Sequence, residues 1–194
     1  MLDLTNVFAS FPVLETERLI LRTSTPADAL DIFHFMSDLR AMKYLVRPLM
    51  ASVDEALQRI QMFQTLFREQ NAVPWVVEGR AADKVIGTCV IQNLVRLHHR
   101  AEIGYMLSPE WWGQGLATEA VTAVLNFAFA QMGMHSLEAR TDPDNAASQK
   151  LLGKLGFVQE GYFREDYYDE VGGKFVDTTV FSLVKGTWER HAGG

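Results

Sequence analysis

The feature that most constrains this chain is a glycine-rich segment between a strand pattern and a long helix pattern. Residues 101–107 carry the strand pattern, residues 117–132 carry apolar side chains at helical spacing, and Gly113 and Gly115 lie between them. Small residues in such a turn let successive backbone N–H groups point into one concavity, and the helix adds the positive end of its dipole. The segment therefore predicts an anion-binding loop, for which pyrophosphate is a natural ligand.

Spacing excludes two common types of phosphate loop. The segment lacks the Gly-Lys-Ser/Thr of a Walker loop. It also lacks the Gly-x-Gly-x-x-Gly spacing of a dinucleotide-binding fingerprint, and no parallel strand precedes it at the start of the chain. From spacing alone, a tight strand-to-helix turn that binds nothing is an equally good interpretation.

The order of the remaining patterns predicts an α/β fold in one domain, residues 1–194, with residues 1–12 as an N-terminal arm. Thr25 and Ser52 are expected N-caps of two helices, the first carrying Leu30, Phe33 and Met36 on its apolar face. Strands are expected at 19–22, 73–77, 85–94, 101–107, 136–140, 158–164 and 178–185, and further helices at 117–132 and 145–155. A meander that leads into β-α-β units indicates a mixed sheet with helices on both faces.

Composition limits the function classes. The net charge of −6 argues against a sequence-independent nucleic-acid binder, which has to neutralise phosphates. Cys89 is the single cysteine and lies in an apolar run, which favours a buried thiol over a nucleophile. The N-terminus lacks a signal-peptide pattern, and no apolar run has the length of a membrane span. A cytoplasmic protein without membrane attachment is expected.

Four ordered motifs resemble the GNAT acetyltransferase superfamily, and in particular its ribosomal-protein N-terminal acetyltransferases of the RimJ/RimL type. The loop Trp-Gly-Gln-Gly-Leu-Ala at 112–117 is similar to that superfamily's acetyl-CoA loop, although Trp112 stands where Gln or Arg is common. Residues 14–22, 101–105 and 144–157 resemble the opening strand, the central strand and the second cofactor motif of the RimJ/RimL branch. The resemblance implies a largely antiparallel sheet that splays at the acetyl-CoA site, with a bulge expected at Gly104.

The same resemblance assigns acetyl-CoA as co-substrate and implies which residues bind it. The backbone N–H groups of Gln114, Gly115, Ala117 and Thr118 are expected to hold the pyrophosphate, and Tyr105, Met106, Leu107 and Asn145 to line the pantetheine arm. From the local sequence alone, Asn145 is an ordinary helix N-cap.

Ser148 and Glu102 are the candidate catalytic residues. By resemblance Ser148 lies near the sulfur, where it would protonate the departing thiolate; from local sequence it is an ordinary helix-surface hydroxyl. Glu102 is a candidate general base whose pKa burial would raise, and a structural carboxylate is the equally weighted alternative. Direct attack in a ternary complex is expected because no activated Cys or Ser-His pair is visible. No metal site is expected, since His98 and His99 are adjacent and without further ligands.

The acceptor is an amine, and by resemblance the α-amine of a ribosomal-protein N-terminus. A small amine such as a polyamine or aminoglycoside, or a non-catalytic acyl-CoA sensor, stays open as an alternative. Residues 26–70 and 165–174 are expected to line the acceptor side. The acidic and aromatic run at 164–170 fits either a solvated hairpin edge or a wall that recognises the acceptor. A homodimer would be consistent with the resemblance.

Overall fold

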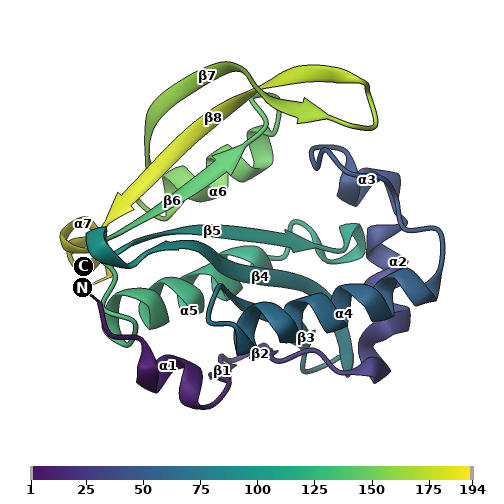
Figure 1. The fold of residues 1–194 in the computed structure, drawn as a ribbon, viewed down its shortest axis with the longest axis horizontal. Helices are drawn as coiled ribbons and strands as arrows, with labels where there is room; N and C mark the ends of the chain where they lie inside the picture. The colour runs from purple at the N-terminus through teal and green to yellow at the C-terminus, as the bar shows by residue number, and fades with distance from the viewer. Residues whose placement is uncertain (1, 193–194) are drawn as a thin grey trace.

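One mixed β-sheet organises the part of the chain that the structure describes (Figure 1). The computed structural model describes residues 2–192; Met1 of the expected arm and Gly193 and Gly194 of the expected domain lie outside them. Within residues 2–192 eight strands pair in the spatial order β1-β2-β3-β4-β5-β6-β8-β7. The strands are β1 (Leu14–Glu15), β2 (Leu19–Arg22), β3 (Val73–Gly79), β4 (Lys84–Val95), β5 (Arg100–Leu107), β6 (Ser136–Thr141), β7 (Val158–Asp169) and β8 (Lys174–Val184). All neighbouring pairs are antiparallel except β5 and β6, which confirms the expected fold class.

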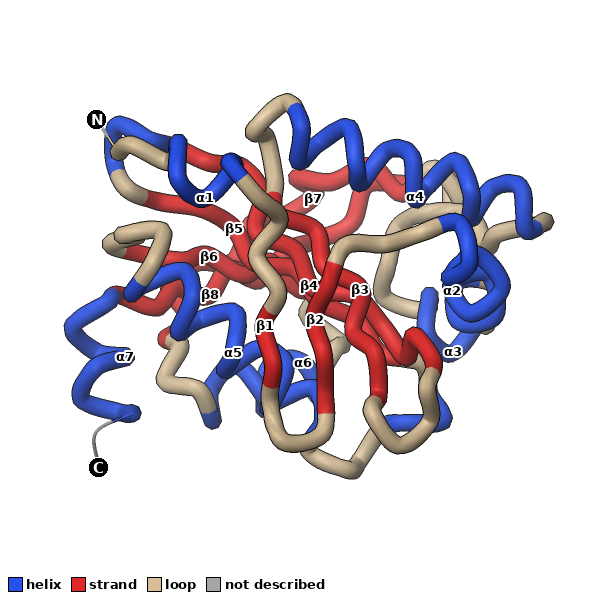
Figure 2. The backbone as a smooth tube through the Cα atoms, turned by 90° about the horizontal axis from the view of Figure 1, so that it is seen from below, coloured by secondary structure: helices blue, strands red, loops and turns tan. Residues whose placement is uncertain are grey.

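Helices cover both faces of this sheet, and Figure 2 shows α4 and α5 on opposite sides of the strands. The helices are α1 (Thr5–Ala9), α2 (Ala29–Met36), α3 (Leu39–Met42), α4 (Val53–Arg68), α5 (Leu116–Ala130), α6 (Ala146–Lys154) and α7 (Lys185–Ala192). Short 3₁₀ turns are η1 (Pro26–Asp28), η2 (Arg96–His98) and η3 (Pro109–Trp111). The apolar stripe expected in α5 is buried: Ala120, Val121, Val124, Leu125 and Ala128 are at most 1% exposed.

The two faces carry separate apolar clusters. Val121 of α5, Leu152 of α6 and Ile103 of β5 belong to the larger cluster. Ile32 of α2, Ile60 of α4 and Val76 of β3 belong to the smaller cluster, and Met106 of β5 packs against it. Because successive side chains of a strand point to opposite faces, β5 presents Ile103, Tyr105 and Leu107 to α5 and α6, and Glu102, Gly104 and Met106 to α2 and α4.

Strands β5 and β6 are paired over only three residues. Their register joins Arg100 to Ser136, Ala101 to Leu137 and Glu102 to Glu138. Beyond this point β5 continues beside β4 and β6 continues beside β8, so the two strands separate. The splay expected from the resemblance is confirmed, and it opens the sheet directly after Glu102.

The expected bulge at Gly104 is wrong. Gly104 pairs regularly with Val90, and the irregularity lies in β4 between Gln92 and Val95. Asn93 has a φ of 52° there. Asparagine tolerates this left-handed conformation better than most residues, so β4 absorbs the extra residue at Asn93 instead of at a glycine of β5.

The apolar face expected for the first helix is also partly wrong. Leu30 is 67% exposed, whereas Ala29, Ile32, Phe35 and Met36 are buried. The capping pair is present, since the Thr25 N–H donates to the Asp28 carboxylate at 2.7 Å. However, the chain first makes the 3₁₀ turn η1, and its tighter winding shifts the phase of the α-helical face that follows.

Three helices were not predicted from the sequence. The expected arm contains α1, and Leu4 and Val7 of this segment are buried in the larger cluster. The Trp75 indole donates to the Pro12 carbonyl at 2.7 Å, which ties the segment to β3. Helix α3 lies between the two expected N-terminal helices, where no further helix was expected, and α7 begins at Lys185, the residue at which the last strand was expected to end.

Candidate active site

Two hydroxyl groups meet at the splay. The Tyr105 hydroxyl on β5 and the Ser148 Oγ on α6 are 2.8 Å apart, a hydrogen bond in which either group can donate. Burial raises the pKa of Tyr105 to about 12, although the hydrogen bond with Ser148 acts in the opposite direction. The phenol therefore keeps its proton at neutral pH and is able to donate it to Ser148.

Asn145 positions Ser148. Its Oδ1 accepts from the Ser148 N–H at 3.1 Å, so Asn145 is the N-cap of α6. The cap uses the amide oxygen, and the Asn145 Nδ2 makes no hydrogen bond to any residue from 2 to 192. The N-cap interpretation holds, and the amide N–H groups are left for the role in pantetheine binding that the resemblance implies.

Glu102 lies at the point where β5 and β6 separate. One carboxylate oxygen accepts from the Gln92 Nε2 at 3.0 Å and the other from the Asn93 Nδ2 at 3.0 Å. Both amides belong to the irregular part of β4, so the bulge has a consequence for the site: it brings Asn93 within reach of Glu102. The carboxylate is half-buried and held by neutral donors, and no cation of residues 2–192 forms an ion pair with it.

The Gly-rich loop has the backbone geometry of an anion site. Gly113 and Gly115 have φ values of 73° and 77°, and Gly115 is the N-cap of α5. The backbone N–H groups of residues 115–118 donate to no acceptor in the described part of the chain. Four free N–H groups at the positive end of a 15-residue helix are the arrangement that binds phosphate oxygens.

A charged cluster fixes this loop to the start of the sheet. Glu119 accepts from the Thr16 hydroxyl at 2.6 Å and pairs with the Arg18 guanidinium at 2.6 Å. Arg18 also donates to the Gln114 carbonyl at 2.9 Å. Burial alone would raise the pKa of Glu119, but the hydrogen bonds from Thr16 and Arg18 outweigh it and hold that pKa below its usual value. The loop is thus positioned before any ligand arrives.

Glu119→Gln should lower the free energy of unfolding at neutral pH by about 1–2 kcal/mol, because the charge-assisted hydrogen bonds to Thr16 and Arg18 are weakened. Since the folded pKa of Glu119 is lowered, its contribution is complete above the unfolded pKa of about 4.3 and is lost as the pH falls through the folded value. Urea unfolding from pH 7 downward measures this difference. Glu17→Gln, an exposed neighbour, is the control; a pH-independent difference for Glu119→Gln would contradict the assignment.

Trp112, Met106 and Leu107 have roles that the sequence did not indicate. The Trp112 indole donates to the Leu107 carbonyl at 2.8 Å, which closes the turn between β5 and the loop. The Leu107 side chain is buried in the larger cluster, and Met106 packs against the smaller one. Any contact of these two residues with a pantetheine arm would therefore come chiefly from the β5 backbone, whose edge is free of β6 beyond Glu102.

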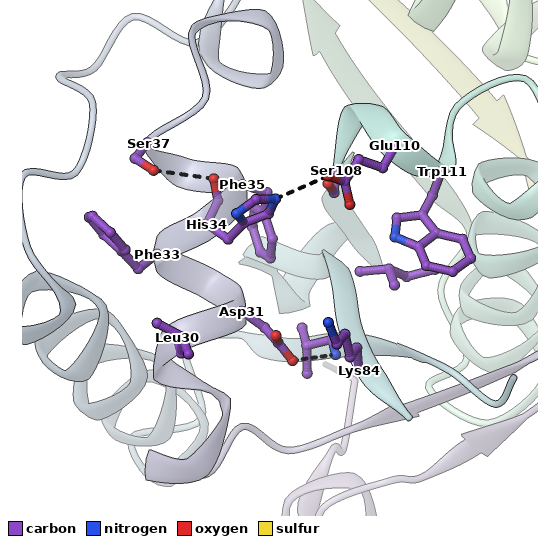
Figure 3. Close-up of a pocket in the computed structure, with 12 residues that line it drawn as sticks. Leu30, Asp31, Phe33, His34, Phe35, Ser37, Lys84, Ser108, Glu110 and Trp111 are labelled. Atoms are coloured by element: carbon purple, nitrogen blue, oxygen red, sulfur yellow. Dashed lines mark hydrogen bonds and ion pairs between the residues drawn. The ribbon is translucent and has the colours of Figure 1, made fainter. Parts of the chain in front are cut away.

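A cavity of about 440 Å³ lies beside the loop, between α2, the start of β4 and η3 (Figure 3). His34 and Glu110 face each other at 3.3 Å across it, and Asp31 accepts from the Val85 N–H at 2.9 Å. The Ser108 Oγ is buried and has no hydrogen-bond partner among the described residues. The expected catalytic and acetyl-CoA-binding residues do not line this cavity, but its α2 residues belong to the segment 26–70 that was expected on the acceptor side.

Two kinds of feature are absent from residues 2–192. In that range no helix is long and apolar enough to cross a membrane. The same residues contain no group of three or more His, Cys, Asp or Glu side chains placed to hold a metal ion. His99 has a φ of 51° at the end of η2, as expected for a turn residue.

Sequence reasoning missed Gln92, Asn93, Arg18 and Thr16 as parts of the site. Arg18 and Thr16 belong to the opening motif at 14–22, so that motif carried a signal, namely a cation and a hydroxyl that pair with the acid of the loop helix. No sequence signal marked Gln92 and Asn93, since their approach to Glu102 depends on the register shift in β4.

Known proteins resemble this chain in sequence and in fold. The family described as acetyltransferase (GNAT) domain matches residues 18–158. The chain is 39% identical over 175 residues to the uncharacterized N-acetyltransferase YoaA of Bacillus subtilis (strain 168), covering 90% of this chain and 98% of that protein. It is 26% identical over 183 residues to the [ribosomal protein uS5]-alanine N-acetyltransferase of Escherichia coli (strain K12), covering 90% and 92%. The crystal structure of an acetyltransferase (GNAT family) from Bacillus anthracis matches with a TM-score of 0.80 at 23% identity, covering 90% and 99%. The family match includes the loop, β5 and α6.

Proposed function

The chain belongs to the GNAT acetyltransferase family, and from that premise we propose that its acceptor is the α-amine of a protein N-terminus. Membership makes the protein an acetyl-CoA-dependent N-acyltransferase. The acceptor is the part that needs a proposal: the relative from Escherichia coli acts on an alanine of ribosomal protein uS5, whereas YoaA carries no assigned acceptor.

One observation carries the catalytic part of the proposal: the hydrogen-bonded Tyr105 and Ser148 lie at the splay of β5 and β6. The free N–H groups of residues 115–118 fit a pyrophosphate, and the unpaired edge of β5 fits an extended arm that leads from the loop to Ser148. Bound acetyl-CoA supplies the activated acyl group. The chain supplies anchoring at the loop, a proton at Ser148 and a carboxylate at Glu102.

Glu102 and Ser148 lie on opposite sides of the sheet. Glu102 points to the α2 and α4 face, and Tyr105, the partner of Ser148, points to the α5 and α6 face. An amine that enters from the α4 side would reach the carbonyl carbon through the opening between the strands. As the C–N bond forms, the amine proton passes to Glu102, directly or through water. As the C–S bond breaks, the thiolate takes the Ser148 proton, which Tyr105 replaces.

The proposed function is tested by thiol release from acetyl-CoA with a panel of acceptors, and mass spectrometry identifies the acetylated atom. The panel comprises peptides with free N-terminal Ala or Ser, the same peptides blocked at the N-terminus, polyamines and aminoglycosides. Acetylation of the free peptides at the α-amine, with kcat/KM at least tenfold above the small amines, is the expected result. Preferential turnover of a polyamine or an aminoglycoside would overturn the peptide acceptor. Acetyl-CoA binding without any turnover would favour the acyl-CoA sensor.

Glu102→Gln separates a base from a structural carboxylate. As a base, Glu102 contributes about 10²–10³-fold to kcat/KM near neutral pH, where most α-amines are partly protonated. Raising the pH should then restore most of the activity of Glu102→Gln, because the amine loses its proton without help. The glutamine keeps the shape of the side chain. Its Oε1 can accept from one of the two amides, and its Nε2 can donate to the other once that amide turns its oxygen toward it. A loss that stays constant from pH 7 to about pH 9.5 would leave Glu102 with a positioning role.

A further inference from the structure

Arg59 of α4 is a half-buried cation without an anionic partner among residues 2–192, shielded in the sense that its Nε is out of contact with solvent. Its Nε is buried and has no hydrogen-bond partner, and no ion pair joins Arg59 to a carboxylate of residues 2–192. The guanidinium lies over the Phe63 ring, 5.0 Å from its centroid, which stabilises the charge through the ring face. That contact leaves the N–H groups unused, since they lie in the guanidinium plane.

The charge is retained despite its surroundings. Burial lowers the pKa of Arg59 to about 10, and repulsion from Arg47 adds to the effect. At neutral pH the guanidinium is still charged. Arg47 is exposed and lies between α3 and α4, and its repulsion of Arg59 places the two cations close together. Two cations side by side, one shielded and unpaired, cost folding free energy unless an anion joins them.

Arg59 lies on the side of the sheet from which the acceptor amine is proposed to enter. Ala56 and Ile60 place α4 on the smaller cluster, against which Met106 packs, so α4 covers the face that Glu102 presents. Figure 1 shows α4 lying across this face.

The direction of Arg59 around α4 follows from the hydrogen bond of Gln64. Gln64 donates to the Ser24 carbonyl at 2.9 Å and marks the flank of α4 next to the end of β2. Arg59 is about 140° away around the helix axis. It therefore points away from β2, toward the side of the sheet that holds β4 and β5.

We propose that Arg59, with Arg47 at its rim, binds a carboxylate of the acceptor, so that the preferred acceptor carries a carboxylate near the amine that is acetylated. This inference rests on the proposed function and narrows its acceptor class. A planar guanidinium matches the two oxygens of a carboxylate, and a charge-assisted pair that is shielded from water is stronger than an exposed one. The carboxylate belongs either to an acidic side chain close to a peptide N-terminus or to the α-carboxylate of a small amino acid.

Paired acceptors test the inference and distinguish these sources. One pair is an Ala-Glu peptide and the corresponding Ala-Gln peptide, both with amidated C-termini; the other is a free amino acid and its amide. We expect the acid member of one pair to have a kcat/KM about 10–100-fold above that of the neutral member. In Arg59→Met this ratio should fall to near 1, and Arg59→Lys should restore part of it.

The stability of the variants tests the alternative that Arg59 serves only to stabilise the fold. Arg59→Met should raise the unfolding midpoint by about 2–4 °C, because a shielded unpaired charge is replaced by an apolar side chain of similar length. Arg68→Met removes an exposed arginine of the same helix and should keep the wild-type acceptor ratio. Equal kcat/KM for both members of both pairs in the wild type would overturn the carboxylate subsite and leave the N-terminal acceptor standing. Turnover of polyamines alone would overturn both.

Discussion

Replacing Ser148 with alanine is expected to lower kcat by about 10²–10³-fold while the Kd for acetyl-CoA stays within about threefold. The hydroxyl is 2.8 Å from the Tyr105 phenol and belongs to a helix that Asn145 caps through the backbone, so its removal leaves the cap intact. What is lost is the proton for the departing thiolate, which matters only after the acyl group begins to leave. Single-turnover kinetics for kcat and calorimetric titration for Kd measure the two quantities separately.

Tyr105→Phe is the companion to this variant. The pKa of Tyr105 is raised to about 12, so the wild-type rate should show no loss of activity from phenol ionisation across the neutral and mildly alkaline range. Tyr105→Phe should cost less than Ser148→Ala, about tenfold, because the serine can draw a proton from water instead. The double variant should be hardly slower than Ser148→Ala alone, since both act through one proton path. Additive losses, or a Ser148→Ala variant that binds acetyl-CoA as poorly as it turns over, would contradict the assigned role.

The sequence predicted those parts of the site whose geometry is local. Gly113, Gly115 and the apolar stripe of α5 specify the loop and its helix within about 20 residues, because left-handed glycines, free N–H groups and helical spacing are properties of a short segment. The N-cap at Asn145 is equally local, and the structure has it. The splay of β5 and β6 was expected only through the resemblance to GNAT proteins, since pairing between strands 36 residues apart leaves no periodic signal.

The features that the sequence did not predict depend on strand register, on helical phase, and on the lack of an anionic partner for Arg59. Glu102 is recognisable as a carboxylate on a strand, but its clamp by Gln92 and Asn93 arises from a shift in β4 that the residue pattern did not locate. Leu30 was misplaced because a 3₁₀ turn changed the helical phase. Arg59 has an ordinary place in a helix sequence. Only the folded arrangement reveals that the cation is shielded and that no described carboxylate reaches it.

Thr118→Asp is expected to raise the Kd for acetyl-CoA about 100-fold at low salt without destabilising the fold. Thr118 lies in the first turn of α5, and its N–H is one of the free donors. An acidic side chain there is favourable for the helix by about 0.3–1 kcal/mol. The same charge repels a pyrophosphate at about 6 Å by about 1.4 kcal/mol per phosphate charge at an effective dielectric of about 40, so two charges give the factor stated. Titration calorimetry with acetyl-CoA and urea unfolding of the free protein measure the two effects.

Thr122→Asp is the matched control, because it adds the same charge to the same helix one turn beyond the free donors. Its Kd should stay within about threefold of the wild type, since charge repulsion falls with distance and with solvent screening. Added salt should narrow the gap between Thr118→Asp and the wild type for the same reason. Equal weakening by both variants would mean that the whole helix, and not its first turn, repels the ligand. An unchanged Kd for Thr118→Asp would place the pyrophosphate elsewhere, and the loop would then be only the turn that connects β5 to α5.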